Sequence, residues 1–460
     1  ASIEHVKRYT TLGMGTDQGK TSNANAIAII SELTGANASD IQHTTFRPPY
    51  VPVSLGAIAA EATGPRLAPT RRSAFHDASA RDNVRFVTSG DWLYPRYYAR
   101  GGETMARAID REVLNTRRRV GMVDMSTLGK ADVQGRDALT FLERVYCNDL
   151  SRVAVGKLRY SLMLREDGIV LDDGTVSRLG EHHYLLTMTT ANSRRVWLHL
   201  EMLRQAHWPE LDVKLASVTD HWANLAIAGP EARSLLSRLE PDFDIANGGF
   251  PFASVRQGRV AGLPARVFRV SFAGELGYEI NVPAGYAETL WSHLGELGRD
   301  LGLMPYGLEA LDVMRIEKGH VSAGTEIDGR TIPSDLGMDR MVSSTKDFIG
   351  RALLDRPALS ANGRRQFVGL VPDDGVTPIP LGAQITRAPW RGKPQSTIGH
   401  VTAALTSPTL GHPVALTLIE DGRSRMGEKV WAVSPVAQSS VEAVITQPAF
   451  YDPRGERLHG

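Results

Sequence analysis

The chain has 460 residues, of which 42% are hydrophobic and 22% charged, a composition typical of a globular protein with two to four domains. Its 52 Lys and Arg residues balance 51 Asp and Glu residues, so a net charge of +1 gives no overall attraction for nucleic acid or an anionic membrane. The single cysteine, Cys147, excludes an intrachain disulfide, a multi-thiolate zinc site and a protein-ligated iron–sulfur cluster.

The ends of the chain and its basic residues add little that is specific. No run reaches about 18 apolar residues and no signal-peptide pattern is present, so we expect a cytoplasmic protein. The chain opens on Ala1 rather than methionine, which predicts a processed product or the C-terminal part of something longer. The only dense basic cluster, Arg117-Arg118-Arg119, is interpreted as a solvated helix face.

Residues 1–60 predict a strand, a glycine-rich loop, a helix at about 24–33 and a proline-rich extended segment. This part is too small and open for a core of its own, so we expect it to lie on a larger body or on a partner. The loop Gly13–Ser22 lacks the spacing of a P-loop or a dinucleotide fingerprint, because Met14 occupies the position of the first P-loop glycine. Nucleotide hydrolysis is therefore not expected, and contact with a flavin phosphate held mainly by another chain stays open.

Residues 92–345 alternate helical and strand patterns without regular β-α-β order, which predicts an α+β fold. Three strands at 159–164, 169–179 and 184–189 predict an antiparallel meander. The predicted helices span 103–118, 135–145, 284–301 and the run from Leu308 to a C-capping Gly319. Residues 365–450 are rich in valine, threonine, glycine and proline and predict a small β-barrel or sandwich.

Two adjacent carboxylates, Asp172 and Asp173, stand inside an apolar, β-branched run. In a strand they point to opposite faces, so one of them must face a pocket or the interior and needs a partner with N–H groups. A polar turn between strands is the alternative that the spacing leaves open.

A third acid, Glu279, lies in a predicted strand–glycine turn–strand segment at 269–280. A carboxylate among apolar neighbours requires a planar pair of donors, either a guanidinium such as Arg269 or Arg315 or the 2-amino/N3 edge of a pterin. Arg315 and Glu317, on the following helix, are interpreted as packing and ion-pairing residues. No group of residues has metal-ligand spacing, so no metal is expected.

These segments, in this order, resemble the folate-binding aminomethyltransferase family, which includes the T-protein of the glycine cleavage system. The resemblance covers roughly residues 85–460 and is carried by Val120–Ser126, Cys147–Asp149, Tyr160–Met163, Asp172-Asp173, Ala228–Pro230, Gly274–Glu279, Phe348–Arg351 and Ser407–Gly411. It implies a multi-domain α+β body that binds folate, followed by a C-terminal β-barrel. The boundaries expected from it are a linking, partner-contact segment at 1–60, the folate-binding domain at 61–345 and the barrel domain at 346–460.

Two stretches of the N-terminal part, Tyr9–Asn23 and Thr45–Tyr50, resemble the middle of the α subunits of heterotetrameric sarcosine oxidases. In that family a dinucleotide-binding half precedes a T-protein-like half, and only the second half is present here. The resemblance implies β, γ and δ-type partner subunits, with FMN or FAD and NAD on other parts of the complex. It implies neither a nucleic-acid nor a membrane partner.

The resemblance assigns five site residues. Asp173 matches the carboxylate beside folate N10, acting as a base or positioning the reacting amine, and Glu279 matches the carboxylate that binds the pterin edge. Tyr160 and Thr189 match positions lining the folate, and Phe272 replaces a tyrosine while keeping a stacking face. Leu311 and Asp452 replace two arginines usual in T-proteins, which argues against lipoyl-carrier chemistry and leaves folate binding in place.

The function implied is tetrahydrofolate-dependent capture of the one-carbon unit from oxidative demethylation of sarcosine, giving 5,10-methylenetetrahydrofolate. One alternative is a free-standing aminomethyltransferase or folate-dependent demethylase, which would work without flavoprotein partners. Another is a non-catalytic folate-binding assembly module. Related iron–sulfur assembly proteins carry a cysteine after a Lys-Gly pair, whereas His320 follows Lys318-Gly319 here, which argues against that branch.

Overall fold

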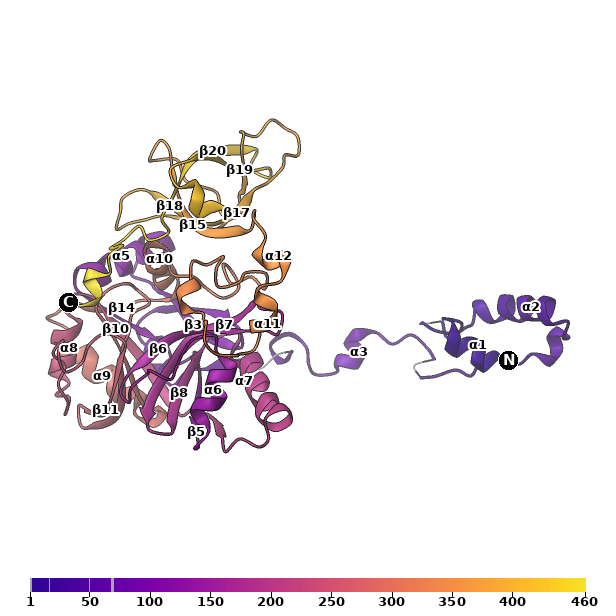
Figure 1. Cartoon of the computed structure of the whole chain (residues 1–460), viewed down its shortest axis with the longest axis horizontal. Coiled ribbons are helices and arrows are strands. Elements are labelled where there is room, and N and C mark those ends of the chain that lie inside the picture. Colours follow the sequence, from indigo (N-terminus) through magenta and orange to yellow (C-terminus); the bar gives the residue numbers. More distant parts are fainter. Residues whose placement is uncertain (1, 16, 49, 68–69) are drawn as a thin grey trace. The chain divides into compact units, whose positions relative to one another are not determined.

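The computed structural model describes residues 2–15, 17–48, 50–67 and 70–460. The chain divides into two compact units, Ala1–Thr70 and Arg71–Gly460 (Figure 1). The domain limits at residues 60 and 345 stay predictions.

The first unit is helical, with α1 (Ile3–Tyr9), α2 (Ser22–Thr34) and α3 (Leu55–Ala59). The strand predicted at its start is wrong: α1 carries Glu4 in its first turn and Lys7 and Arg8 in its last turn, which suits the helix dipole. The helix predicted at 24–33 is confirmed as α2 and ends at Gly35, which adopts the left-handed conformation that favours glycine.

The first unit has almost no apolar interior. Among its described residues Ile3 is the only buried hydrophobic side chain, while Tyr9, Leu33 and Leu55 are largely exposed. The prediction that this segment lacks a core of its own is therefore confirmed.

The second unit contains two large sheets, a small sheet and a barrel. The six-stranded sheet has the order β11 (Ser254–Val260), β12 (Leu263–Arg269), β13 (Gly277–Pro283), β10 (Trp222–Ala228), β4 (Val120–Asp124) and β14 (Leu303–Pro305). The five-stranded sheet has the order β6 (Leu158–Leu164), β7 (Val170–Gly180), β8 (His183–Met188), β5 (Gly129–Gln134) and β9 (Lys214–Ser217). The small sheet has the order β1 (Arg71–Arg72), β3 (Trp92–Tyr98) and β2 (Val84–Ser89).

The predicted meander is confirmed, because β6, β7 and β8 pair antiparallel in sequence order. The helices of this unit are α4 (His76–Ala80), α5 (Met105–Arg118), α6 (Ala138–Val145), α7 (Ser193–Met202), α8 (Ala232–Arg238), α9 (Ala287–Leu297), α10 (Leu308–Lys318), α11 (Arg351–Leu354) and α12 (Pro357–Ser360). The helix predicted to run to residue 301 ends at Leu297, whereas α10 ends at Gly319 as expected, with φ 73°.

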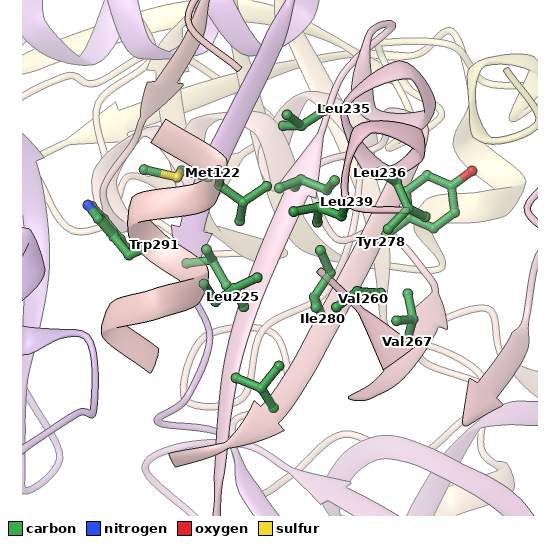
Figure 2. Close-up of a cluster of buried hydrophobic side chains, with 14 of the residues drawn as sticks. Met122, Leu225, Leu235, Leu236, Leu239, Val260, Val267, Tyr278, Ile280 and Trp291 are labelled. Atoms are coloured by element: carbon green, nitrogen blue, oxygen red, sulfur yellow. The ribbon is translucent and has the colours of Figure 1, made fainter. Parts of the chain in front are cut away.

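Helices α8 and α9 cover one face of the six-stranded sheet. Figure 2 shows Leu235 and Leu236 of α8, Leu239 directly after it and Trp291 of α9 packed against side chains of the central strands, among them Leu225 and Ile280. At about 25 cal/mol per Å² of apolar surface, this burial is the main force that holds the helices on the sheet. The opposite face of the six-stranded sheet packs against the five-stranded sheet, and Leu158, Leu185 and Phe268 lie between the two sheets.

Six strands close into a C-terminal barrel (orange to yellow in Figure 1): β15 (Arg365–Pro372), β18 (Pro413–Glu420), β17 (Gly399–Thr406), β16 (Gln384–Thr386), β19 (Lys429–Ser434) and β20 (Ser439–Thr446). The barrel packs on the body through a shared apolar cluster that includes Ile316, Phe348, Phe367 and Leu416. The predicted α+β fold with a C-terminal β-barrel is confirmed.

Candidate functional site

The two adjacent aspartates lie on opposite faces of β7. Asp172 is 2% exposed and lies on the same face of the sheet as Met163, the residue opposite it on β6. Asp173 is partly exposed and shares the other face with Thr175, two residues further along the strand. The turn alternative is wrong because β7 continues from Val170 to Gly180 without a break.

The inward aspartate is held by the end of β8. Asp172 accepts hydrogen bonds from the backbone N–H of Thr189 at 3.1 Å and from Asn192 Nδ2 at 3.0 Å. Burial, followed by the neighbouring Asp173, raises the pKa of this carboxyl to about 6. Asp172 therefore anchors the strand end and adds negative charge behind its neighbour.

The outward aspartate is surrounded by two of the predicted folate-lining residues. The Tyr160 hydroxyl donates to Asp173 Oδ2 at 2.7 Å, and Thr189 Oγ1 lies 3.4 Å from Asp173 Oδ1. Burial raises the pKa of Asp173 above its ordinary value, while these two hydroxyls oppose the rise. The structure thus brings together Tyr160 of β6, Asp173 of β7 and Thr189 directly after β8.

Glu279 lies in the centre of the other sheet. On β13 it is flanked by Ala226 of β10 and Phe268 of β12. Its Oε2 accepts a hydrogen bond of 2.7 Å from Asn224 Nδ2. Burial raises the pKa of Glu279, and the opposing influences are Asn224 and then Lys130.

The guanidinium alternative for Glu279 is wrong. Arg269 donates to backbone carbonyls, that of Phe250 among them, and Arg315 pairs with Glu326 at 3.0 Å. The interpretation of Arg315 as an ion-pairing residue is confirmed, and so is that of Glu317, which pairs with Arg117 at 2.7 Å.

Two cavities meet at Glu279. The first has about 300 Å³ of empty space, open solvent included, and is lined by Val123, Met125, Ala226, Ile227, Ala228, Val270, Ser271, Phe272, Ala273, Gly277, Glu279, Tyr306 and Leu311. The second has about 310 Å³ of empty space, open solvent included, between the two large sheets and is lined by Leu158, Thr175, Leu185, Thr187, Asn224, Phe268, Val270, Glu279 and Asn281. None of these described lining residues is Lys or Arg.

The second cavity connects the two halves of the predicted site. Thr175, on the same face of β7 as Asp173, lines it together with Glu279. Phe272 and Glu279 both line the first cavity. Asp173, Tyr160 and Thr189 are therefore one group, Phe272 and Glu279 are a second, and the row of side chains on β7 leads from one to the other.

Around Glu279 there are more hydrogen-bond acceptor atoms than N–H or O–H donors to satisfy them. Asn224 is 1% exposed, and after Nδ2 bonds to Glu279 its buried Oδ1 has no partner among the described residues. A carboxylate and an amide oxygen side by side in an apolar cavity require a ligand that brings N–H groups. The 2-amino/N3 edge of a reduced pterin has this donor pattern, so the residues present fit such a ligand.

Several residues of this centre were not singled out from the sequence. Asn224 fixes Glu279, and its backbone N–H donates to Ser126 Oγ at 3.0 Å. Ser126 N in turn donates to the buried carboxylate of Asp124 at 2.9 Å. A signal was present for Asn224, which is a polar residue inside the otherwise apolar strand β10, but nothing in the sequence linked it to Glu279.

The interpretation of Arg117 as part of a solvated helix face is wrong. It is 4% exposed, stacks on the Tyr451 ring at 4.1 Å and donates to the Ala273 carbonyl at 2.7 Å. It also pairs with Glu275 and Glu317, because α5 packs its C-terminal end into the body. Arg117 thereby secures the loop that carries Ser271–Ala273 into the first cavity.

The two positions that depart from the T-protein pattern have different environments. Leu311 lines the first cavity next to Phe272. Asp452 instead pairs with Lys318 at 2.8 Å and lies among residues of the C-terminal tail.

Sequence profiles of known families cover most of the chain. The GCVT N-terminal domain matches residues 75–346, and the glycine cleavage T-protein C-terminal barrel domain matches residues 365–452. The chain therefore belongs to the glycine cleavage T-protein family. A crystal structure of the glycine cleavage system aminomethyltransferase T from Bartonella henselae has the same fold, with a TM-score of 0.72 at 22% identity over 83% of this chain and 98% of that one.

Within this family the chain is similar to one particular branch. It is 46% identical to sarcosine oxidase subunit alpha of Rhizobium meliloti (strain 1021), over 99% of this chain and 46% of that subunit. It is 34% identical to an aminomethyltransferase of Streptomyces avermitilis over 69% of this chain and 82% of that enzyme. Residues 1–62 match the sarcosine oxidase A3 domain. The chain spans about half the length of its sarcosine oxidase relatives.

The described residues contain neither a candidate membrane span nor a candidate metal site. No described helix is both long and apolar enough to span a bilayer. No group of three or more His, Cys, Asp or Glu side chains in the described part of the chain could hold a metal ion.

Proposed function

We propose that this chain is the tetrahydrofolate-binding half of a sarcosine oxidase α subunit. It would transfer the one-carbon unit from oxidative demethylation of sarcosine to folate, giving 5,10-methylenetetrahydrofolate. The observation that carries the proposal is the cavity around Glu279, where Asn224 Nδ2 donates to the carboxylate and the buried Oδ1 of Asn224 has no donor among the described residues. The similarity to sarcosine oxidase α subunits along the whole chain supports the choice of reaction.

Glu279 and Asn224 would hold the N–H edge of the pterin, and Phe272, 37% exposed at the first cavity, would offer an aromatic face for stacking. Tyr160 and Thr189 would line the folate beside Asp173. The folate, when bound, supplies the two nitrogens that accept the one-carbon unit. Holding both reactants in one site replaces a bimolecular encounter by a positioned one.

Asp173 would orient the folate N10 amine and remove its proton. The raised pKa of this carboxyl makes it a stronger base than an exposed aspartate, and the Tyr160 hydroxyl keeps it in a defined orientation. The buried Asp172 behind it keeps the strand end fixed through Thr189. FMN or FAD and NAD would be held by other parts of the complex, together with β, γ and δ-type subunits.

The direct test compares Asp173→Asn with wild type in the assembled complex. We expect the yield of methylenetetrahydrofolate per sarcosine oxidised to fall by about 10²-fold or more, with free formaldehyde rising in its place. Tyr160→Phe is the matched control, because it removes the hydroxyl that contacts Asp173 and leaves the carboxyl in place, so a smaller loss is expected. An unchanged yield in Asp173→Asn would show that Asp173 has no such role.

The aminomethyltransferase relatives, of which the chain covers 82%, favour a second candidate. A free-standing aminomethyltransferase or demethylase would turn over without flavoprotein partners. Assaying the isolated 460-residue chain with reduced folate and an amine donor separates the two, since our proposal expects folate binding and no turnover there. Folate binding without turnover even in the complete assembly would instead indicate a non-catalytic module.

A further inference from the structure

A buried lysine lies behind the proposed folate cavity and takes no part in the function described so far. Lys130, on β5, is 1% exposed. Its Nζ donates to the backbone carbonyls of Ser126 at 2.9 Å and Leu128 at 3.0 Å, so two of its three N–H groups serve carbonyls rather than a carboxylate. A buried ammonium is costly unless opposite charge lies near it.

The opposite charge belongs to the buried Asp124 and the partly exposed Glu279, and both are reached through one hydrogen-bond network. Ser126, whose carbonyl accepts from Lys130, donates its backbone N–H to Asp124 at 2.9 Å. Its hydroxyl accepts from the backbone of Asn224 at 3.0 Å, and Asn224 Nδ2 reaches Glu279 at 2.7 Å. Asp124 and Glu279 are also the first two groups whose charge stabilises the Lys130 ammonium, ahead of Asp220.

The network contains fewer positively charged groups than negatively charged groups. One ammonium, Lys130, faces two carboxylates, Asp124 and Glu279. The other titratable groups coupled to Glu279 are the phenols of Tyr94 on β3 and Tyr306 before α10, and both are neutral near pH 7 because burial raises their pKa further above 10. Burial lowers the pKa of Lys130 itself to about 8, so below that pH Lys130 is the cation that favours the ionised form of Glu279.

We propose that Lys130 is a positioning residue that sets the charge of Glu279, and that binding of an N–H-donating ligand releases a proton from Glu279 to solvent. In the protein without ligand, burial favours the protonated carboxyl; donors from the ligand favour the carboxylate, so the O–H bond of Glu279 breaks and the proton leaves to buffer. The inference rests on the proposed reduced-folate site and adds its regulation by pH.

The sign of the pH dependence follows directly. Ligand affinity is highest at alkaline pH, where Glu279 is already ionised, and falls as the pH drops through the raised pKa of this group. Removing the Lys130 charge raises that pKa further, because the ammonium no longer favours the carboxylate form of Glu279. In the Lys130 variants the affinity loss then begins at a higher pH, so their Kd exceeds that of wild type in the range where Glu279 titrates. The affinities converge at alkaline pH, where Lys130 of wild type is also neutral.

The test measures binding of 5-formyltetrahydrofolate to the full 460-residue chain by calorimetry, from pH 5.5 to 9 and in two buffers of different ionisation enthalpy. Lys130→Met removes the charge, and Lys130→Gln removes it while keeping an N–H donor, in case the first variant does not fold. Lys346→Met is the control, since the half-buried Lys346 also donates to two carbonyls, those of Glu143 and Tyr146, and pairs with the Glu143 carboxylate at 3.0 Å, outside both cavities.

We expect wild type to release protons when the ligand binds, and we expect Glu279→Gln to lack the proton that Glu279 contributes. We also expect the Lys130 variants, and not Lys346→Met, to shift the affinity profile toward alkaline pH. Equal weakening at every pH, or identical profiles for the Lys130 and Lys346 variants, overturns this inference and leaves the folate site intact. Absence of any binding to wild type overturns the proposed function itself.

Discussion

The buried glutamate Glu112 on α5 predicts an unusual pH dependence of stability. Its side chain is 0% exposed, and its two oxygens accept the backbone N–H groups of Tyr98 at 2.7 Å and Gly307 at 2.9 Å. It therefore connects α5 both to β3 and to the start of α10. Burial raises the pKa of this carboxyl from an ordinary 4.5 to about 7.

The rise in pKa converts into free energy of unfolding. At about 1.4 kcal/mol per pH unit, moving the pKa of Glu112 from 4.5 to about 7 corresponds to about 3 kcal/mol. Because the folded value lies above the unfolded one, this contribution is complete below pH 4.5 and is lost as the pH rises through 7. The protein is thus expected to lose stability between pH 5 and pH 8 through this one group.

The assay compares wild type with Glu112→Gln by denaturant unfolding at pH 5, 6.5 and 8. The amide turns one acceptor into a donor that faces a backbone N–H, which costs about 1–3 kcal/mol at every pH. The advantage of wild type at pH 5 should therefore shrink by about 3 kcal/mol at pH 8.

Glu103→Gln is the control for this series. Its hydrogen bond with Arg111 lowers the pKa of Glu103, so this carboxyl stays ionised from pH 5 to 8. Its stability difference from wild type should be constant over that range. The reasoning about Glu112 is refuted if the difference between wild type and Glu112→Gln does not change between pH 5 and pH 8.

Two further predictions concern packing around the site. Arg117→Met leaves the buried Glu317 without its cation and Glu275 with Arg457 at 3.7 Å, so it should cost about 3–5 kcal/mol in unfolding free energy. Arg118→Met, at the exposed neighbour, should change it little, and equal effects would contradict the buried ion cluster. In Gly174→Ala the new Cβ would lie 2.0 Å from the Thr187 carbonyl, so we expect a lower Tm and weaker folate binding. Gly180→Ala on the same strand meets nothing closer than 3.5 Å and should match wild type in thermal melts and folate titrations.

Sequence patterns predicted those parts of the molecule that depend on near neighbours. The alternating side-chain pattern that predicted β6, β7 and β8 and the glycine that ends α10, Gly319, are local features of the sequence. Both predictions are confirmed. The opposite orientation of Asp172 and Asp173 is also a local property, since successive side chains in a strand point to opposite faces of the sheet. Resemblance in chain order then identified the family, because no single motif was specific enough.

Only the tertiary structure decided which partners the buried charges have. Glu279 lies 55 residues from Asn224, and Arg117 lies 200 residues from Glu317, so no local pattern could connect them. A carboxylate in an apolar strand is equally compatible with a guanidinium, an amide or a ligand until the neighbouring strand is in place. The sequence by itself determined that one of the two adjacent aspartates would be buried and that Glu279 would lie among apolar neighbours. The packing of distant segments buried Arg117 and determined what neutralises these charges, because electrostatic partners are set by distance in space.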